Sequence, residues 1–191
     1  MTNPVPKQTY LADLQARVSH NRQVVQTLFV PLGREERSWQ PAPDQWSVDQ
    51  CFEHLILSFN HWLPDVEEAL ATPEPVDADG LFRSSWWGRR LMGRLWAPQK
   101  NYRTKNKFVP EDTYYPDVLT RFRQQLDHLS ALLERAVAAD LQTKFWWHKE
   151  ILIRFNLGEH LYAFVSHDEL HIGQARRALE AHAQQTEVVV A

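Results

Sequence analysis

Four stretches of the chain carry apolar residues at three- and four-residue steps, which is the spacing of one face of an amphipathic helix. Outside them, no stretch alternates apolar and polar residues convincingly enough to predict a strand. The pattern therefore predicts an all-α protein whose helices form an antiparallel four-helix bundle. The predicted helices run from about Thr9 to Leu32, from Ser47 through Val66, from near Pro116 through Val137, and from Asn156 to about His182.

Polar residues mark the points where two of these helices begin. Ser47 with Gln50, and Asn156 with Glu159, have the spacing of a capping box, in which each side chain bonds the backbone N–H of the other residue. Pro64 lies inside the second helical stretch. Because proline lacks an N–H, we expect Pro64 to kink or end that helix.

The connections between the helices are uneven in length. Residues 33–46 are predicted to be a loop rich in proline and tryptophan, and residues 140–155 form another connection. The link at residues 72–114 is too long to be a simple turn. The last residues, 186–191, are expected to fray.

Composition places the chain among soluble globular proteins. It has 191 residues, of which 43% are hydrophobic and 24% charged, so we expect a single domain over residues 1–191. The net charge of −3 creates no strong field that would favour nucleic acid or a membrane surface. One cysteine excludes an intrachain disulfide and a cysteine-rich metal site, whereas nine histidines leave room for an imidazole site.

Features of export are missing from the sequence. The first ten residues lack the basic and apolar regions of a secretory signal. No apolar run approaches the roughly 20 residues that cross a bilayer. The lone Cys51 also agrees with a reducing compartment, so we expect a cytoplasmic protein without membrane contact.

Three histidines share one stripe of the fourth predicted helix. His160, His167 and His171 are seven and four residues apart, which places all three toward the bundle interior. A single inward histidine is usually a core residue with a hydrogen bond, and a pair four residues apart often arises by chance. Burying three imidazoles without partners costs free energy, however, and one metal ion bound by His167 and His171 would offset that cost.

A third ligand would have to come from another helix. His54 and His61 share a face of the second predicted helix because they are seven residues apart. Cys51, one turn before His54, is another candidate, although a single helical cysteine is more often a small core residue. Periodicity does not choose among the three.

Two motifs resemble a known family. Residues 46–55, WSVDQCFEHL, are similar to the W-S-x-x-x-x-x-x-H-L start of the second helix in DinB-like (damage-inducible) metal-binding proteins. Residues 167–174, HDELHIGQ, resemble the H-x-x-x-H-x-x-Q signature of that family near its C-terminus. Order, spacing and capping match, and the resemblance covers nearly the whole chain.

The resemblance implies a four-helix bundle, frequently dimeric, that holds a divalent ion such as nickel, zinc or manganese. The implied ligands are His54, His167 and His171. Some members use low-molecular-weight thiols such as bacillithiol or mycothiol in transfer reactions, and others isomerise small acids. Gln174 is then a candidate hydrogen-bond partner around the ligands, and His160 is either an extra ligand, an outer base or a core histidine.

A site of three neutral imidazoles leaves at least one metal position open for water or substrate. The ion then acts as a Lewis acid, or lowers the pKa of a bound water or thiol. The sequence shows no convincing protein nucleophile, so a thiol would have to be brought in from outside. Glu53, next to His54, is expected to be solvated.

The long link is basic and rich in tryptophan between Leu81 and Pro110. The first interpretation is an insertion that packs its tryptophans on the bundle while its charged groups stay solvated. The second is an anion-binding lid over the metal. The third is a surface that contacts nucleic acid or a membrane, and we rank the three in this order. Arg83, Arg89, Arg90 and Arg94 are the anion-binding candidates. The remaining basic residues and the interleaved tryptophans are Lys100, Arg103, Lys105, Lys107, Trp86, Trp87 and Trp96.

Three functions compete at this point. The first is a metal-dependent enzyme acting on a small molecule, as a thiol-dependent S-transferase, an isomerase or a hydrolase. The second is a non-catalytic bundle that binds a partner or nucleic acid through the link at residues 81–110. The third is a stress-related scaffold without metal, against which the complete set of three histidines argues.

Overall fold

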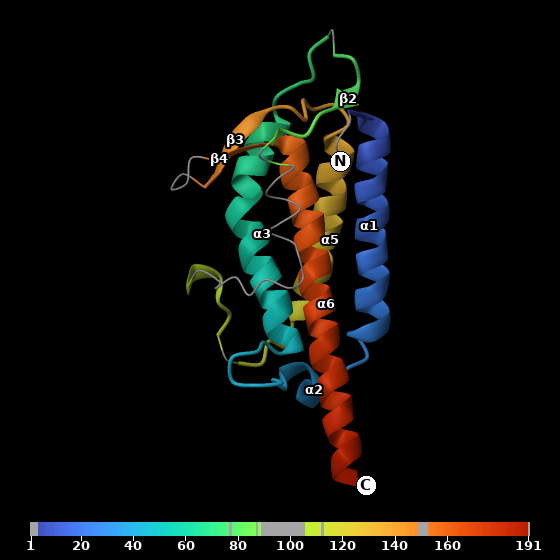
Figure 1. Cartoon of the computed structure of the whole chain (residues 1–191), viewed down its shortest axis with the longest axis vertical. Coiled ribbons are helices and arrows are strands. Elements are labelled where there is room, and N and C mark those ends of the chain that lie inside the picture. Colours follow the sequence, from blue (N-terminus) through green and yellow to red (C-terminus); the bar gives the residue numbers. More distant parts are fainter. Residues whose placement is uncertain are drawn as a thin grey trace.

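The structure is a computed structural model of the whole chain. It describes a helical bundle with short strands at one end (Figure 1). The described residues are 4–76, 78–86, 88, 106–111, 113–148 and 153–190.

Four long helices form the bundle that the apolar spacing predicted. They are α1 (Lys7–Leu28), α3 (Val48–Leu70), α5 (Val118–Arg135) and α6 (Leu157–Val190). A short helix, α2 (Arg34–Ser38), lies within the segment at residues 33–46 that was predicted to be a loop. The all-α fold class is confirmed.

The directions of the helices differ from the simple antiparallel arrangement that we expected. α1 and α3 each pack against both α5 and α6, which places α1 and α3 at opposite corners. The ends of α3 and α5 meet, because the N–H of Asp140 donates to Thr72 O at 3.0 Å. The starts of α1 and α6 also meet, because Tyr10 Oη donates to Gly158 O at 2.8 Å. α1 therefore runs parallel to α6, and α3 runs parallel to α5 (Figure 1).

This topology explains the length of the link between α3 and α5. Both helices end at the same end of the bundle, so the chain must return along the whole bundle before α5 begins. A helix of 23 residues such as α3 is about 35 Å long, which no short turn can span. Within this link the structure describes a short 3-10 helix, η1 (Asn106–Phe108).

The predicted capping boxes are present at both helix starts. Gln50 N donates to Ser47 Oγ at 3.2 Å, and Ser47 N donates to Gln50 Oε1 at 2.9 Å. Glu159 N donates to Asn156 Oδ1, and Asn156 N donates to Glu159 Oε2, both at 2.9 Å. The reciprocal bonds satisfy N–H groups that have no partner within the helix.

α3 does not end at Pro64, which was one of the two outcomes expected there, and α6 does not end near His182. α3 continues through Pro64 to Leu70, because the buried residues Val66 and Ala69 pack the last turns onto the bundle and outweigh one missing N–H. α6 runs past His182 to Val190, and it projects beyond the other helices (Figure 1). Residues 183–185 are good helix formers, and no glycine or proline follows them to stop the helix. The fraying expected for residues 186–191 is therefore not seen up to Val190.

Two small antiparallel sheets cap the end of the bundle where α6 starts. β1 (Val5–Pro6) pairs with β2 (Leu81–Phe82), and β3 (Lys144–His148) pairs with β4 (Ile153–Asn156). The β3–β4 hairpin occupies the connection at residues 140–155, where we expected no strand. Its aromatic and β-branched residues favour strands, and that composition was the missed signal.

The core lies between the four helices and is rich in phenylalanine. Phe52 of α3 contacts Phe29 at 5.1 Å and Phe122 of α5 at 4.9 Å between ring centroids. All three are fully buried, and each contributes roughly 2–3 kcal/mol by burial. Among the described helices, none combines the length and the apolar character needed to cross a membrane.

Candidate metal centre

Three histidines converge where α3 packs against α6. His54 comes from the second turn of α3, and His167 and His171 stand one turn apart on α6. One ring nitrogen from each lies within 4.8 Å of the other two. His54 Nε2 and His167 Nε2 are 3.1 Å apart. The packing of two antiparallel helices thus joins a pair that is local in sequence to a residue more than 100 positions away.

The donor set and its spacing fit a transition metal ion. Nitrogens bound at about 2.0–2.1 Å in a tetrahedral site are roughly 3.4 Å apart, close to the separation of His54 and His167. The wider limit of 4.8 Å to His171 requires only small side-chain rotations. Imidazole ligands suit zinc, nickel and copper better than magnesium or calcium.

Hydrogen bonds behind two of the rings fix which nitrogen faces the centre. His54 Nδ1–H donates to Phe108 O at 2.8 Å, and His171 Nδ1–H donates to Gln174 Oε1 at 2.9 Å. Each bond places the hydrogen on Nδ1 and the lone pair on Nε2, which is the arrangement expected around a ligating histidine. The Nε2 of His54 also lies within hydrogen-bond distance of His167 Nε2, at 3.1 Å. The structure places Gln174 in its predicted position. The Phe108 carbonyl carries no sequence signal, because any residue could supply it.

All three imidazoles are neutral near pH 7. Burial lowers the pKa of His54, and it lowers the pKa of His171 to about 3. The pKa of His167 is also well below its usual value, through burial first and then through the neighbouring His171 and His54. Neutral rings compete for a cation without first losing a proton, so the site is ready to bind metal.

The site reaches the surface beside an aromatic wall. The Trp46 ring lies 4.7 Å from the ring of His54 and 5.7 Å from that of His171. His54 is buried, whereas His167 and His171 are half-buried, so a small molecule can approach from their side. Trp46 therefore lines the site.

His160 stands outside the cluster of three. It is buried two turns before His167, with its ring 5.0 Å from Phe164 and 6.0 Å from Trp62. Burial lowers its pKa to about 3. Within the described residues it does not join the group that surrounds the metal position. The geometry is that of a core histidine, not of a fourth ligand.

The other two candidates from α3 also lie outside the cluster. Cys51 is fully buried in the hydrophobic core, and burial raises the pKa of its thiol. His61 is exposed, and its Nε2 accepts a hydrogen bond from Lys107 Nζ at 2.9 Å. Of the three candidates on α3, the described structure therefore brings only His54 next to His167 and His171, a distinction that periodicity did not make.

Glu53 is not solvated, contrary to the prediction. Its side chain is only 11% exposed and forms an ion pair with Arg121 of α5. The physical reason is the bundle topology, because α3 is covered on one side by α6 and on another by α5. A residue next to the His54 face consequently meets a helix instead of water.

The structure describes only part of the basic link between Leu81 and Pro110. Arg89, Arg90 and Arg94, with Lys100, Arg103 and Lys105, lie outside the described residues, as do Trp87 and Trp96. Arg83 forms an ion pair with Asp79 and its backbone carbonyl accepts a bond from Asn156 Nδ2. Asn156 precedes α6, so Arg83 lies some three turns from His167 and not over the three histidines.

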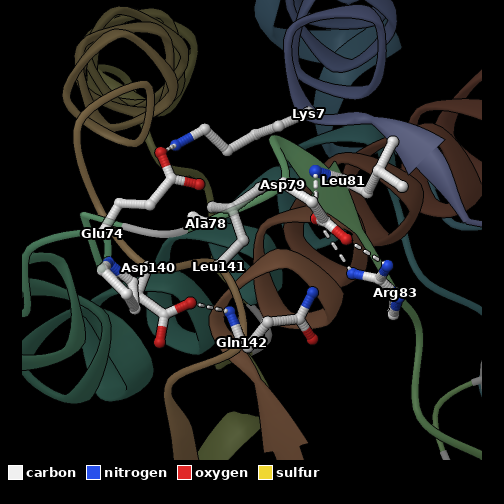
Figure 2. Close-up of a pocket in the computed structure, with 10 residues that line it drawn as sticks. Lys7, Glu74, Ala78, Asp79, Leu81, Arg83, Asp140, Leu141 and Gln142 are labelled. Atoms are coloured by element: carbon white, nitrogen blue, oxygen red, sulfur yellow. Dashed lines mark hydrogen bonds and ion pairs between the residues drawn. The ribbon is translucent and has the colours of Figure 1, made fainter.

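Arg83 instead lines a pocket of about 320 Å³ at the opposite end of the bundle (Figure 2). Lys7, Glu74, Asp79 and Gln142 also line it. Lys7 pairs with Glu74, and Asp79 pairs with Arg83. Each cation among the described residues that line this pocket thus already has an anionic partner, and the Lys7–Glu74 pair ties the start of α1 to the segment that follows α3.

The match to a family covers most of the chain. The model of the DinB superfamily matches residues 17–175, a range that contains all three histidines. The chain belongs to the DinB superfamily. No curated protein matches the chain as a relative.

The fold of this DinB-superfamily chain is also found among solved structures. It is similar to YfiT from Bacillus subtilis, with a TM-score of 0.52 and 16% identity over 90% of this chain and 85% of that one. YfiT is described as a probable metal-dependent hydrolase with an unusual four-helix bundle topology. At this identity the likeness concerns the fold alone.

Proposed function

We propose that this protein is a divalent-metal-dependent enzyme that acts on a small molecule at His54, His167 and His171. The observation that carries the proposal is the convergence of three neutral ring nitrogens on one point, two of them held by hydrogen bonds on the far side of the ring. Nickel, zinc and manganese are the candidate ions.

When bound, a divalent ion supplies Lewis acidity and lowers the pKa of a water or thiol at the open position. The residues of the chain orient the ligands and control access to the site. Phe108 O and Gln174 orient two imidazoles, Trp46 shields one side from water, and the half-buried His167 and His171 leave the other side open. Orientation of this kind typically changes metal affinity or activity 10- to 100-fold.

The nucleophile is an external group, and we favour a low-molecular-weight thiol. The single cysteine, Cys51, is enclosed in the core with a raised pKa, so it cannot attack a substrate at the surface. A thiol-dependent transfer needs only a thiolate from solution beside a bound electrophile. Isomerisation of a small acid with the same thiol uses the same arrangement.

Hydrolysis is the second candidate, favoured by the description of YfiT. It would use the same three ligands, with water in place of the thiol. A non-catalytic role through the link at residues 81–110, a stress-related scaffold role and a homodimer all stay predictions.

Elemental analysis of the untagged protein tests the metal site. We expect about one divalent ion per chain in the wild type, loss of the ion in His167→Ala, and retention in His20→Ala, which removes an exposed histidine of α1. A wild-type chain that takes up no nickel, zinc or manganese would contradict the proposal.

The reaction class is tested by a thiol panel with an electrophilic substrate. Consumption of the electrophile that requires both metal and thiol supports transfer. Metal-dependent hydrolysis of esters or amides without a thiol supports the second candidate. If neither reaction occurs in metal-loaded protein, the enzymatic proposal fails although the metal site stands.

A further inference from the structure

Two carboxylates of α3 that lie near His54 in sequence are turned away from the metal position. Asp49 is fully buried and accepts hydrogen bonds from Arg37 Nε at 2.8 Å and from Tyr115 N at 3.2 Å. Glu53, next to His54, pairs with Arg121 of α5. Each acid is neutralised by a cation on another element, so neither contributes negative charge to the histidines.

Two further carboxylates lie between the α6 ligands in sequence, and they are also engaged elsewhere. Asp168 is buried in the core and accepts a hydrogen bond from Gln125 Nε2 of α5 at 3.2 Å. Glu169 pairs with Arg17 of α1 at 2.7 Å. Four acids thus surround the ligands in sequence, but the site itself consists of three neutral rings.

The charged side chains that remain near the site are cations. Arg177, which follows His171 on α6 by about 9 Å, forms no ion pair or hydrogen bond with any residue that the structure describes. Its charge contributes to the lowered pKa of His171. Lys107 sits at the other rim, because the carbonyl of the next residue, Phe108, bonds His54.

Lys107 is held in place without a carboxylate partner in the described part of the chain. Its ammonium lies 4.9 Å from the Phe108 ring centroid and 5.9 Å from that of Trp62, and it donates to His61 Nε2 at 2.9 Å. Asp65, one turn after His61, opposes the lowering of the His61 pKa by burial and by Lys107, but it forms no ion pair with Lys107 among the described residues. An ammonium has three donors, so two of them still point to solvent or to a ligand.

We propose that the three-histidine site takes a small anionic substrate, whose carboxylate or phosphate is bound by Lys107 and His61. This inference rests on the proposed metal-dependent function and names its substrate class. His61 lies seven residues from His54, about 10 Å along α3, so the substrate reaches from the metal position to Lys107 across a distance of that order. Arg177 attracts anions to the site without selecting their length.

Linear dicarboxylates of four to eight carbons provide a test on zinc-loaded protein. Calorimetric titration measures their affinity beside that of monocarboxylates of equal length. We expect one dicarboxylate length to bind at least tenfold more tightly than its monocarboxylate, since one carboxylate meets the metal and the other meets Lys107. Diphosphonates of the best length distinguish phosphate from carboxylate preference.

Substitutions of Lys107 and of Arg177 distinguish the roles of these two cations. Lys107→Met is expected to abolish the advantage of the dicarboxylate and leave the monocarboxylate affinity unchanged, and Lys107→Arg should restore much of it. Arg177→Met should weaken both ligands, the doubly charged one at least as much, and should keep the preference for one dicarboxylate length. Arg176→Met, which removes an exposed charge one residue away, should weaken neither.

The outcomes distinguish this inference from the proposed function. If zinc-loaded protein binds both acids equally, or if Lys107→Met keeps the dicarboxylate advantage, the inference is wrong and the metal site remains. If the wild type binds no metal, the proposed function fails and the inference fails with it.

Discussion

At the end of the bundle where α1 begins and α3 and α5 finish, charged side chains neutralise one another. Lys7 pairs with Glu74, and Arg83 pairs with Asp79, around the pocket shown in Figure 2. At the histidine centre, polar side chains also gather between helices, but there they face one another as neutral rings without a described acid among them. At the first of these two places, the charged groups are paired with one another within the chain.

The difference shows which polar cluster calls for a ligand. Paired charges lower the free energy of the folded chain locally and need nothing further. The Nε2 atoms of His54 and His171 carry lone pairs because their Nδ1–H groups donate elsewhere, and one cation can bind both together with His167. The presence of a pocket at the paired end does not make that end the functional one.

The largest predicted effect concerns the ion pair that keeps Asp49 away from the histidines. Asp49→Ala leaves the Arg37 guanidinium buried without its partner, which should cost about 3–5 kcal/mol of the free energy of unfolding. Chemical denaturation measures this cost, and Asp44→Ala, which removes an exposed carboxylate nearby, should cost little. If Asp49→Ala were as stable as the control, the buried pair would not be structural.

Metal removal should have the next largest effect. A ligand present at 100 times its dissociation constant stabilises the folded state by about 2.7 kcal/mol. Chelation should therefore lower the melting temperature of the wild type, and zinc should raise it again. His171→Ala should show no response to either reagent. A melting temperature that zinc does not change in the wild type would argue against the centre.

Acid stability provides an effect that is smaller for each pH unit and that separates His160 from the ligands. Its folded pKa of about 3 lies below the usual 6.5, so its contribution is complete above pH 6.5 and is lost as the pH falls toward 3. In metal-free protein, His160→Phe should reduce the loss by about 1.4 kcal/mol per pH unit in that window. Denaturation at several pH values measures the slope, and an unchanged slope would show that His160 is not buried as a neutral ring.

The smallest effect is expected at the paired end of the bundle. Asp79→Ala removes the partner of Arg83, but both side chains are half exposed, so water replaces the lost contact. Neither the melting temperature nor the metal content should change measurably. A loss of bound metal in Asp79→Ala would contradict the separation of the two ends.

Much of this arrangement could be predicted from residues that act locally. Ser47 and Asn156 mark helix starts through bonds within one turn, and the spacing of His167 and His171 follows from helical geometry. The choice of His54 over His61 came only from the family resemblance, since the two share a helical face. The packing of α3 against α6 places His54 next to His167, which periodicity within one helix does not show.

Features that depend on tertiary packing could not be predicted in this way. The parallel course of α3 and α5 follows from which helices meet, and no single segment records it. The burial of Glu53 follows from the same packing, through Arg121 of α5. The hydrogen bond from His54 to Phe108 uses a backbone carbonyl, which every residue has.

X-ray absorption spectroscopy of the metal-loaded protein tests the central claim most directly. We expect three imidazole nitrogens at about 2.0–2.1 Å from one zinc ion, with the outer-shell scattering of histidine rings and an open position filled by a light atom. Scattering by sulfur at about 2.3 Å in the absence of added thiol, or a shell of oxygen atoms without imidazole, would contradict it.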